Sequence, residues 1–214
     1  VMTFISFIQI LLAAMVLGVF IGDHFIGVNP FQLLRDSNVL DKAPSMHVGF
    51  NLAQPIRTDY LSLITDGNDL NPLLQNYWMT IHPPVLFLGF ASTIVPFAYA
   101  LAGLWSGDMK EWVKAAAPWT LFTIASLGLG IMMGSKWAYE SLNFGGYWAW
   151  DPVENASLVP WLIMVAGAHT LLIFKHTGRS LKSSFIFLIL AFVFIVYSTY
   201  LTKSGILGDA SVHA

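Results

Sequence analysis

The chain of 214 residues contains no cysteine, and only 10% of its residues are charged. Without cysteine, this chain cannot form disulfides, use a thiol nucleophile or hold an iron–sulfur cluster through its own thiolates. The formal net charge of −2 is too small to indicate a nucleic-acid-binding surface. Soluble domains carry about 25% charged residues, whereas 56% of this chain is hydrophobic. This composition indicates that lipid surrounds most of the chain.

Five apolar stretches are long enough to cross about 30 Å of hydrocarbon as helices. They are residues 3–21, 84–105, 115–134, 152–174 and 184–201. The sequence therefore predicts an all-α polytopic membrane helix bundle with about five transmembrane helices. We interpret residues 1–214 as one transmembrane domain and as part of a longer protein. Within it, we expect an outer loop at 22–83 and a tryptophan-rich segment at 135–157.

Lysine and arginine are concentrated in the two short loops that separate the predicted spans. These residues are Lys110 and Lys114 in one loop, and Lys175, Arg179 and Lys182 in the other. Because basic short loops remain in the cytoplasm, both should face that side of a cytoplasmic (inner) membrane. The acidic loop 22–83, the tryptophan-rich segment and the C-terminal end are then expected on the outer face.

The segment before the fourth predicted span combines two glycines with Tyr147, Trp148 and Trp150. Glycine allows a backbone to fold closely or to approach a ligand. Tyrosine and tryptophan also favour membrane interfaces, so by itself the stretch fits an aromatic belt equally well. The next residues, Asp151-Pro152-Val153-Glu154, have the pattern of a helix capping box. They therefore predict the start of the fourth helix.

Three histidines stand out by their positions relative to the predicted spans. His82 lies at the outer mouth of the second span, where two prolines restrict the chain directly after the imidazole. His213 lies beyond the outer end of the fifth span. His169 lies inside the fourth span, about 25 Å from its start along a helix. An ionisable residue inside a span suggests a function, and heme ligation, proton relay and helix–helix hydrogen bonding all remain open for His169.

Three motifs carry a resemblance to a known family. Residues 145–157 resemble the tryptophan-rich signature, or WWD domain, of a heme-handling protein family, with Tyr147 in place of its first tryptophan. The ending Asp-Pro-Val-Glu-Asn-Ala-Ser resembles one branch, the heme lyase subunits of cytochrome c-type biogenesis. Residues 71–76 with 81–84, and 202–205 with 211–213, are similar to further motifs of that branch.

This resemblance implies heme handling in cytochrome c maturation, with heme presented at the outer face for covalent attachment to apocytochrome c. It implies that His82 and His213 are axial ligands of the substrate heme iron, and that His169 ligates the iron of a second, b-type heme. The residues implied in the heme platform are Tyr147, Trp148, Trp150 and Asp151. Family members are longer, and the partner of His169 belongs to a later span, so the b-type heme is expected only in the complete assembly.

The resemblance also implies partners: a periplasmic heme chaperone, apocytochrome c with its thiol-handling subunit, quinol, and the remaining part of the protein or a split subunit. The chain would be a component of a heme lyase, or cytochrome c synthase, without a catalytic nucleophile of its own, because apocytochrome supplies the thiols. Heme needs aromatic faces, axial imidazoles and donors for its propionates. We expect Phe144 to add to the faces, Trp137 and Trp161 to flank them, and Lys136 and indole N–H groups to reach propionates.

Other functions remain open. A heme delivery or export subunit of the same family would hold heme at the outer face without forming the thioether. A quinone-coupled b-type cytochrome or transport subunit would use His169 but give His82 and His213 no role. In a purely structural membrane subunit, the tryptophans would serve only as an anchor.

Overall fold

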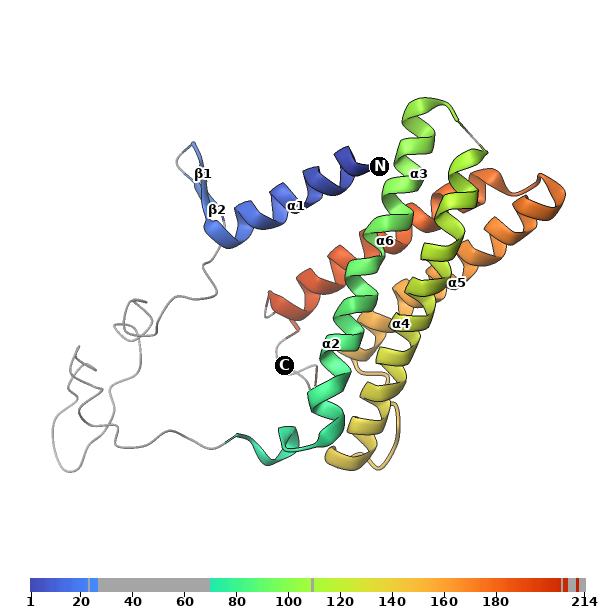
Figure 1. The fold of residues 1–214 in the computed structure, drawn as a ribbon. Coiled ribbons are helices and arrows are strands. Elements are labelled where there is room, and N and C mark those ends of the chain that lie inside the picture. Colours follow the sequence, from blue (N-terminus) through green and yellow to red (C-terminus); the bar gives the residue numbers. More distant parts are fainter. Residues whose placement is uncertain (23, 27–69, 109, 205, 208–210, 212–214) are drawn as a thin grey trace, which may run out of the picture. The chain divides into compact units, whose positions relative to one another are not determined.

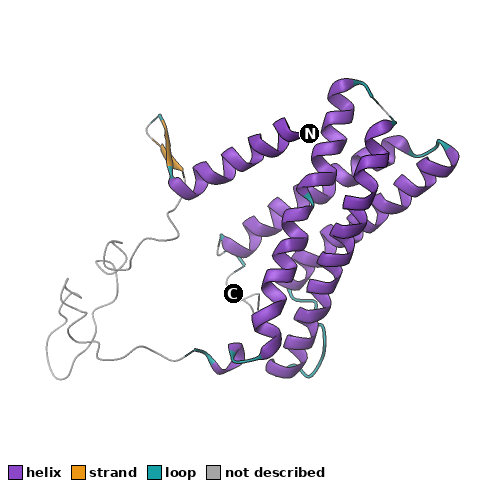
Figure 2. Cartoon of the chain, viewed as in Figure 1, coloured by secondary structure: helices purple, strands orange, loops and turns teal. Residues whose placement is uncertain are grey.

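The described residues of this computed structural model are almost entirely helical (Figures 1 and 2). They are residues 1–22, 24–26, 70–108, 110–204, 206, 207 and 211. The elements are α1 (Met2–Leu17), β1 (Val19–Ile21), β2 (His24–Ile26), the 3-10 helix η4 (Pro72–Leu74), α2 (Tyr77–Ser92), α3 (Ile94–Ser106), α4 (Glu111–Ser141), α5 (Pro152–Thr177) and α6 (Leu181–Lys203). The prediction of an all-α membrane bundle is confirmed.

The chain divides into two compact units, residues 8–70 and residues 1–7 with 71–214. In the smaller unit, α1 ends at Leu17 and a short antiparallel hairpin follows, with Phe20 paired to Phe25. Gly22 has a φ of +61° at the turn of this hairpin, a conformation that glycine adopts without steric cost.

Four helical stretches are long and apolar enough to cross a membrane: Tyr77–Ser106, Glu111–Ser141, Pro152–Thr177 and Leu181–Thr202. They contain the last four predicted spans. The first predicted span, 3–21, differs, because α1 has only 16 residues. Such a helix is about 24 Å long, which is shorter than the hydrocarbon core. The strand β1 takes up the rest of the stretch. Residues 77–83, expected at the end of the outer loop, are helical.

The second span consists of two helices, α2 and α3, with a turn at Thr93. Pro96 has no N–H, so the carbonyl of Ser92 loses its usual partner four residues later. The hydroxyl of Thr93 donates to the carbonyl of Phe90 at 2.6 Å. A hydroxyl that bonds back to its own helix compensates for part of such an interruption.

Glycines allow α2 and α4 to approach each other closely. A Cβ built on Gly89 of α2 would lie 2.5 Å from the Cα of Leu127, and one on Gly130 of α4 would lie 2.6 Å from the Cα of Leu86. Small residues at such interfaces are typical of packed membrane helices. The two helices run side by side (Figure 1), and His82 in the first half of α2 thereby lies against Gly134 in the last part of α4.

The other helix pair, α5 and α6, is packed around large side chains. Trp112 at the start of α4 packs against this pair, with its ring 4.5 Å from that of Phe185 in α6 between centroids, and Met164 and Leu188 are fully buried nearby. Near the opposite end, the hydroxyl of Ser198 donates to the carbonyl of Ala156 across the two helices. The four long helical stretches therefore form the frame on which the tryptophan-rich segment is held.

Candidate functional site

A cavity of about 240 Å³ lies between the four long helical stretches and the tryptophan-rich segment. His82, Trp137 and Trp148 line it together with aliphatic side chains and with hydroxyl groups from α6. Pockets that bury most of a drug-sized ligand have volumes of about 300–1,000 Å³. This cavity can therefore enclose only part of a ligand as large as heme.

His82 lies in the second turn of α2, on the wall of this cavity. Its Nδ1 is 2.7 Å from the carbonyl oxygen of Gly130 in α4. Because a carbonyl can only accept, Nδ1 carries the proton and donates, and in the neutral ring Nε2 then carries the lone pair. Histidines that bind metals commonly have this arrangement, in which a backbone carbonyl fixes the tautomer.

The tryptophans of this region have two different roles. The indole nitrogen of Trp137 donates to the carbonyl of Leu73 at 2.9 Å, and that of Trp161 donates to Ile124 at 3.0 Å. Both indoles therefore tie helices or turns together. The Nε1 of Trp148, by contrast, is buried and has no hydrogen-bond partner in the described part of the chain. Trp148 is thus a cavity-lining indole whose N–H has no partner among the described residues.

The segment before α5 is held by the capping box that the sequence predicted. The carboxylate of Asp151 accepts from the backbone N–H of Val153 at 2.8 Å. Glu154 reaches back to accept from the N–H groups of Ala149 and Asp151 at 2.9 and 3.2 Å. The prediction of a helix start at Asp151 is confirmed.

Asp151 has a second role that the sequence did not indicate. It is buried, and its Oδ1 also accepts from the hydroxyl of Ser211 at 2.8 Å. This bond joins the residue that caps α5 to a residue that follows α6. Backbone N–H groups at the start of α5 and the hydroxyl of Ser211 therefore engage the carboxylate that the sequence analysis placed in the heme platform. His213, two residues after Ser211, lies outside the described residues.

The aromatic residues of the segment do not form one flat shelf. The rings of Trp148 and Trp150 meet edge to face, with centroids 6.2 Å apart and planes at 84°. Trp150 is 72% exposed, and its φ of +59° is unusual for a residue with a side chain. Tyr147 stacks on Tyr139 of α4 at 4.3 Å. Trp148 therefore lines the cavity, while Trp150 and Tyr147 face outward.

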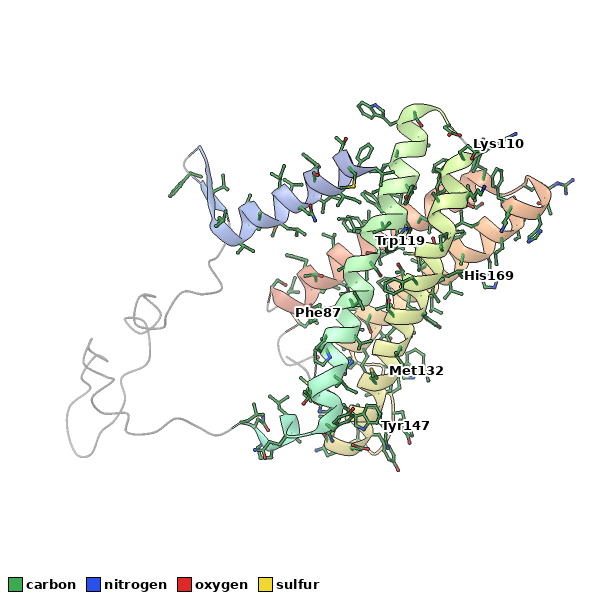
Figure 3. The ribbon with its side chains drawn as sticks, viewed as in Figure 1. Phe87, Lys110, Trp119, Met132, Tyr147 and His169 are labelled. Atoms are coloured by element: carbon green, nitrogen blue, oxygen red, sulfur yellow. The ribbon has the colours of Figure 1, made fainter. Side chains whose placement is uncertain are left out.

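Charged side chains gather at the end of α4 beside this segment. Lys136 forms an ion pair with Glu140 at 2.9 Å, and the Asn76 side chain donates to Glu140 at 3.0 Å. The charge of Lys136 is therefore already paired. At 31 residues, α4 is about 46 Å long, so it can extend past a hydrocarbon core of about 30 Å. Figure 3 shows Lys110 and Tyr147 at opposite ends of this helix.

His169 does not belong to the cavity. It lies on the exposed side of α5 (Figure 3), and its Nδ1 is 2.8 Å from the carbonyl oxygen of Val165 in the same helix. By the same reasoning as for His82, Nε2 carries the lone pair of the neutral ring. The structure thus assigns His82 and His169 to two separate environments. Among the described residues, there is no group of three or more His, Cys, Asp or Glu side chains that could hold a metal ion.

Sequence reasoning missed two glycines of α4 that contact the site, Gly130 and Gly134. The carbonyl of Gly130 binds His82, and the ring of His82 lies against Gly134. The only signal in the sequence is their spacing of four residues, which is also the pattern of ordinary close helix packing. The α6 hydroxyl groups of Ser198, Thr199 and Thr202 that line the cavity were also missed.

Comparison with known proteins gives consistent matches. The family model described as cytochrome C assembly protein matches residues 1–207. The cytochrome c-type biogenesis protein CcmF of Pseudomonas aeruginosa is 45% identical over 150 residues, which are 70% of this chain and 22% of that protein. The CcmF of Escherichia coli is 43% identical over 150 residues, covering 70% of this chain and 23% of its own length.

A solved structure, cytochrome c heme lyase CcmF, matches with a TM-score of 0.56 and 39% identity over 75% of this chain and 25% of that chain. The chain therefore spans about a quarter of the length of the relatives that it matches.

Proposed function

This chain belongs to the cytochrome C assembly protein family, and we propose that it presents heme at the outer membrane face for covalent attachment to apocytochrome c. The resemblance to the heme lyase branch is confirmed by its similarity to CcmF proteins. The observation that carries the proposal is His82, whose tautomer is fixed on the wall of a cavity that is also lined by Trp148, an indole whose N–H has no partner among the described residues.

His82 is the proposed axial ligand of the substrate heme. Donation from Nδ1 to Gly130 leaves the lone pair on Nε2, and a hydrogen bond of this kind also raises the basicity of the ligating nitrogen. Aromatic and aliphatic groups of the cavity provide apolar contact for the porphyrin. Because the cavity holds only part of a heme, the reactive edge would remain accessible to apocytochrome c.

Trp148 is the proposed donor for a heme propionate. Its buried Nε1 has no partner among the described residues, and leaving a buried donor unsatisfied costs about 1–3 kcal/mol. A carboxylate would satisfy it with a charge-assisted hydrogen bond. Trp137 and Trp161 cannot act in the same way while they bind backbone carbonyls.

We place the second axial ligand at His213. The bond between Ser211 and Asp151 supports this assignment, because it holds the chain two residues before His213 against the tryptophan-rich segment. In this proposal Asp151 contributes by holding that segment and the start of α5, while Tyr147 and Trp150 extend the platform outward.

His169 fits the role of a ligand to a resident b-type heme. Its ring is exposed on α5, its Nδ1 bonds to Val165 and its remaining nitrogen can bind iron. Because the imidazole faces away from the helix bundle, it suits a heme whose other axial ligand comes from a further helix, as the sequence resemblance implies. Such a heme, when bound, would supply electrons that keep the substrate iron reduced. This chain's own contribution is one imidazole of fixed tautomer.

The proposed orientation places the tryptophan-rich segment outside an inner membrane. Four apolar helical stretches mark the chain as a membrane protein. The two basic loops lie at the end of the helices away from the tryptophan-rich segment (Figures 1 and 3), which supports a cytoplasmic position for them. Apocytochrome c, a thiol-handling subunit and a periplasmic heme chaperone are then the expected partners on the outer side, with quinol in the membrane.

The test is His82→Gly in the complete protein, with holocytochrome c measured by its covalent heme. We expect maturation to be lost and then partly restored by added imidazole, because a small ligand can fill the vacant axial position. His176→Gly, an exposed histidine at the far end of α5, is the matched control and should mature cytochrome c normally. Unchanged maturation in His82→Gly at normal protein level would contradict the proposal and favour a quinone-coupled b-type cytochrome or transport subunit.

A further inference from the structure

We propose that Gly130 and Gly134 of α4 are positioning residues for the His82 ligand: one fixes its tautomer, and the other makes room for its ring. The inference rests on the proposed function of His82 as a heme ligand. It assigns a role to two residues that have no side chain and do not contact iron themselves.

The room beside Gly134 is occupied by the imidazole of His82. A Cβ built on Gly134 would lie 2.6 Å from Cε1 and 3.0 Å from both Nδ1 and Nε2. A contact of 2.6 Å is far inside the normal separation of about 3.5–4.0 Å between carbon atoms. The imidazole has only two side-chain torsions, and Nδ1 is tied to Gly130. A methyl group at residue 134 would therefore push the ring away from α4 and break or bend that hydrogen bond.

Gly130 and Gly134 act on the same surface of α4, because residues four apart lie one helical turn apart. Within the helix, the carbonyl of Gly130 also accepts from the backbone N–H of Gly134. Its second lone pair accepts from His82. A Cβ on a helix tilts toward the N-terminus, so a side chain at 134 would cover the turn that contains this carbonyl. The missing side chain of Gly134 thus exposes the acceptor that Gly130 offers.

Ordinary helix packing explains the other glycines of α4 but not Gly134. At Gly130, a Cβ would meet the backbone of Leu86, which is a helix–helix contact. At Gly128, a Cβ would meet the indole of Trp161 at 2.8 Å. Only at Gly134 are the three nearest atoms those of the proposed iron ligand. Gly128→Ala is therefore a matched control: the same substitution on the same helix, against an aromatic ring, but without contact to His82.

The first experiment titrates the purified complete protein with hemin and follows the absorption spectrum of imidazole-ligated heme. Loss of a group that orients a metal ligand reduces affinity about 10- to 100-fold, and we expect this loss in Gly134→Ala. Alanine forms helices better than glycine, so a weakened helix does not explain such a loss. Gly128→Ala should keep the wild-type affinity and spectrum.

The same titration in double variants separates positioning from packing. In a His82→Gly background, the ring that the methyl group displaces is gone, so Gly134→Ala should lower hemin affinity by less than about twofold further. If Gly134→Ala instead acts by moving α2 and α4 apart, the losses of hemin affinity caused by the two substitutions will multiply in the double variant.

The second experiment tests the Gly130 carbonyl without altering α4. Hemin-loaded His82→Gly protein is titrated with 4-methylimidazole and with 1-methylimidazole, which have equal bulk. The first keeps an N–H that can donate to the Gly130 carbonyl, and the second does not. One neutral hydrogen bond corresponds to about a two- to tenfold difference in binding, so we expect restoration of the ligated spectrum to need that much more 1-methylimidazole.

The outcomes distinguish this inference from the proposed function. If His82→Gly binds hemin with the wild-type spectrum, the proposed function of His82 fails. The role of Gly134 is refuted if His82→Gly loses heme ligation while Gly134→Ala binds hemin as tightly as Gly128→Ala does. It is also refuted if the losses of hemin affinity from His82→Gly and Gly134→Ala multiply in the double variant. Equal potency of the two methylimidazoles would refute the role of Gly130. Each result is read from ligation spectra of folded protein at matched concentration.

Discussion

Trp148→Phe should weaken heme binding without weakening the fold. The substitution keeps an aromatic ring at the cavity wall and removes the buried Nε1, which has no partner in the described part of the chain. An unsatisfied buried donor costs about 1–3 kcal/mol, and its removal offsets the packing lost with the smaller ring. We therefore expect the free energy of unfolding in the absence of heme to change by less than about 1 kcal/mol.

The expected effect on binding is larger. A hydrogen bond to a charged group contributes about 1.5–3 kcal/mol, which corresponds to about a 10- to 150-fold change in affinity. If the acceptor is a propionate, the loss should be seen with hemin but not with hemin dimethyl ester, whose esters carry no charge. The assay is a titration of the complete protein in detergent with both compounds, alongside thermal unfolding of the heme-free protein.

Trp137→Phe is the matched control, because Trp137 also lines the cavity but its Nε1 donates to the carbonyl of Leu73. It should lower stability by about 1 kcal/mol, the value of one lost hydrogen bond, and leave the ratio of hemin to diester affinity unchanged. The reasoning is refuted if Trp148→Phe weakens hemin and its dimethyl ester equally, or if it weakens neither.

The remaining predictions concern the other histidines and the orientation. His213→Gly in the complete protein should lose cytochrome c maturation and partly regain it with added imidazole, whereas the control His47→Gly should mature cytochrome c normally. Protein levels are measured alongside, and intact maturation in His213→Gly would rule out His213 as the second axial ligand. His169→Ala should weaken or abolish a low-spin b-type heme spectrum in the full assembly, and an unchanged spectrum would assign His169 to helix packing. Single cysteines at Trp148 and Lys182 should react differently with an impermeant maleimide in intact cells, with labelling at 148 only; labelling at 182 only would invert the topology.

Local sequence patterns predicted those features that neighbouring residues determine. The apolar stretches of residues 84–105, 115–134, 152–174 and 184–201 all lie within long helical stretches, because a span must satisfy its backbone within itself. The pattern Asp151-Pro-Val-Glu154 predicted the capping box, whose bonds join residues within one turn. The predicted span at residues 3–21 differs from the structure because hydropathy does not show where a helix ends and a hairpin begins. Likewise, the prolines after His82 lie inside α2 instead of at its start.

The sequence also identified His82 and the tryptophan-rich segment as the candidate site, but it could not sort their roles. The composition counts eight tryptophans and does not distinguish one from another. An indole N–H can meet a backbone carbonyl, as in Trp137, or be buried without a partner among the described residues, as in Trp148, and which occurs depends on residues far away in the chain. The bond between Asp151 and Ser211 spans 60 residues and has no local signature.

The sequence by itself therefore determined the four long apolar helical stretches and the start of α5, since these depend on residue type and short-range spacing. Only the tertiary structure decided which nitrogen of His82 donates a hydrogen bond. That choice depends on the approach of α2 to α4, where Gly134 leaves room for the imidazole and the carbonyl of Gly130, 48 residues from His82, accepts the hydrogen bond from Nδ1. The hydrogen-bond partner across the helix interface sets the tautomer of the histidine. Which residue is that partner depends on how the two helices pack, and not on how close the residues are in the sequence.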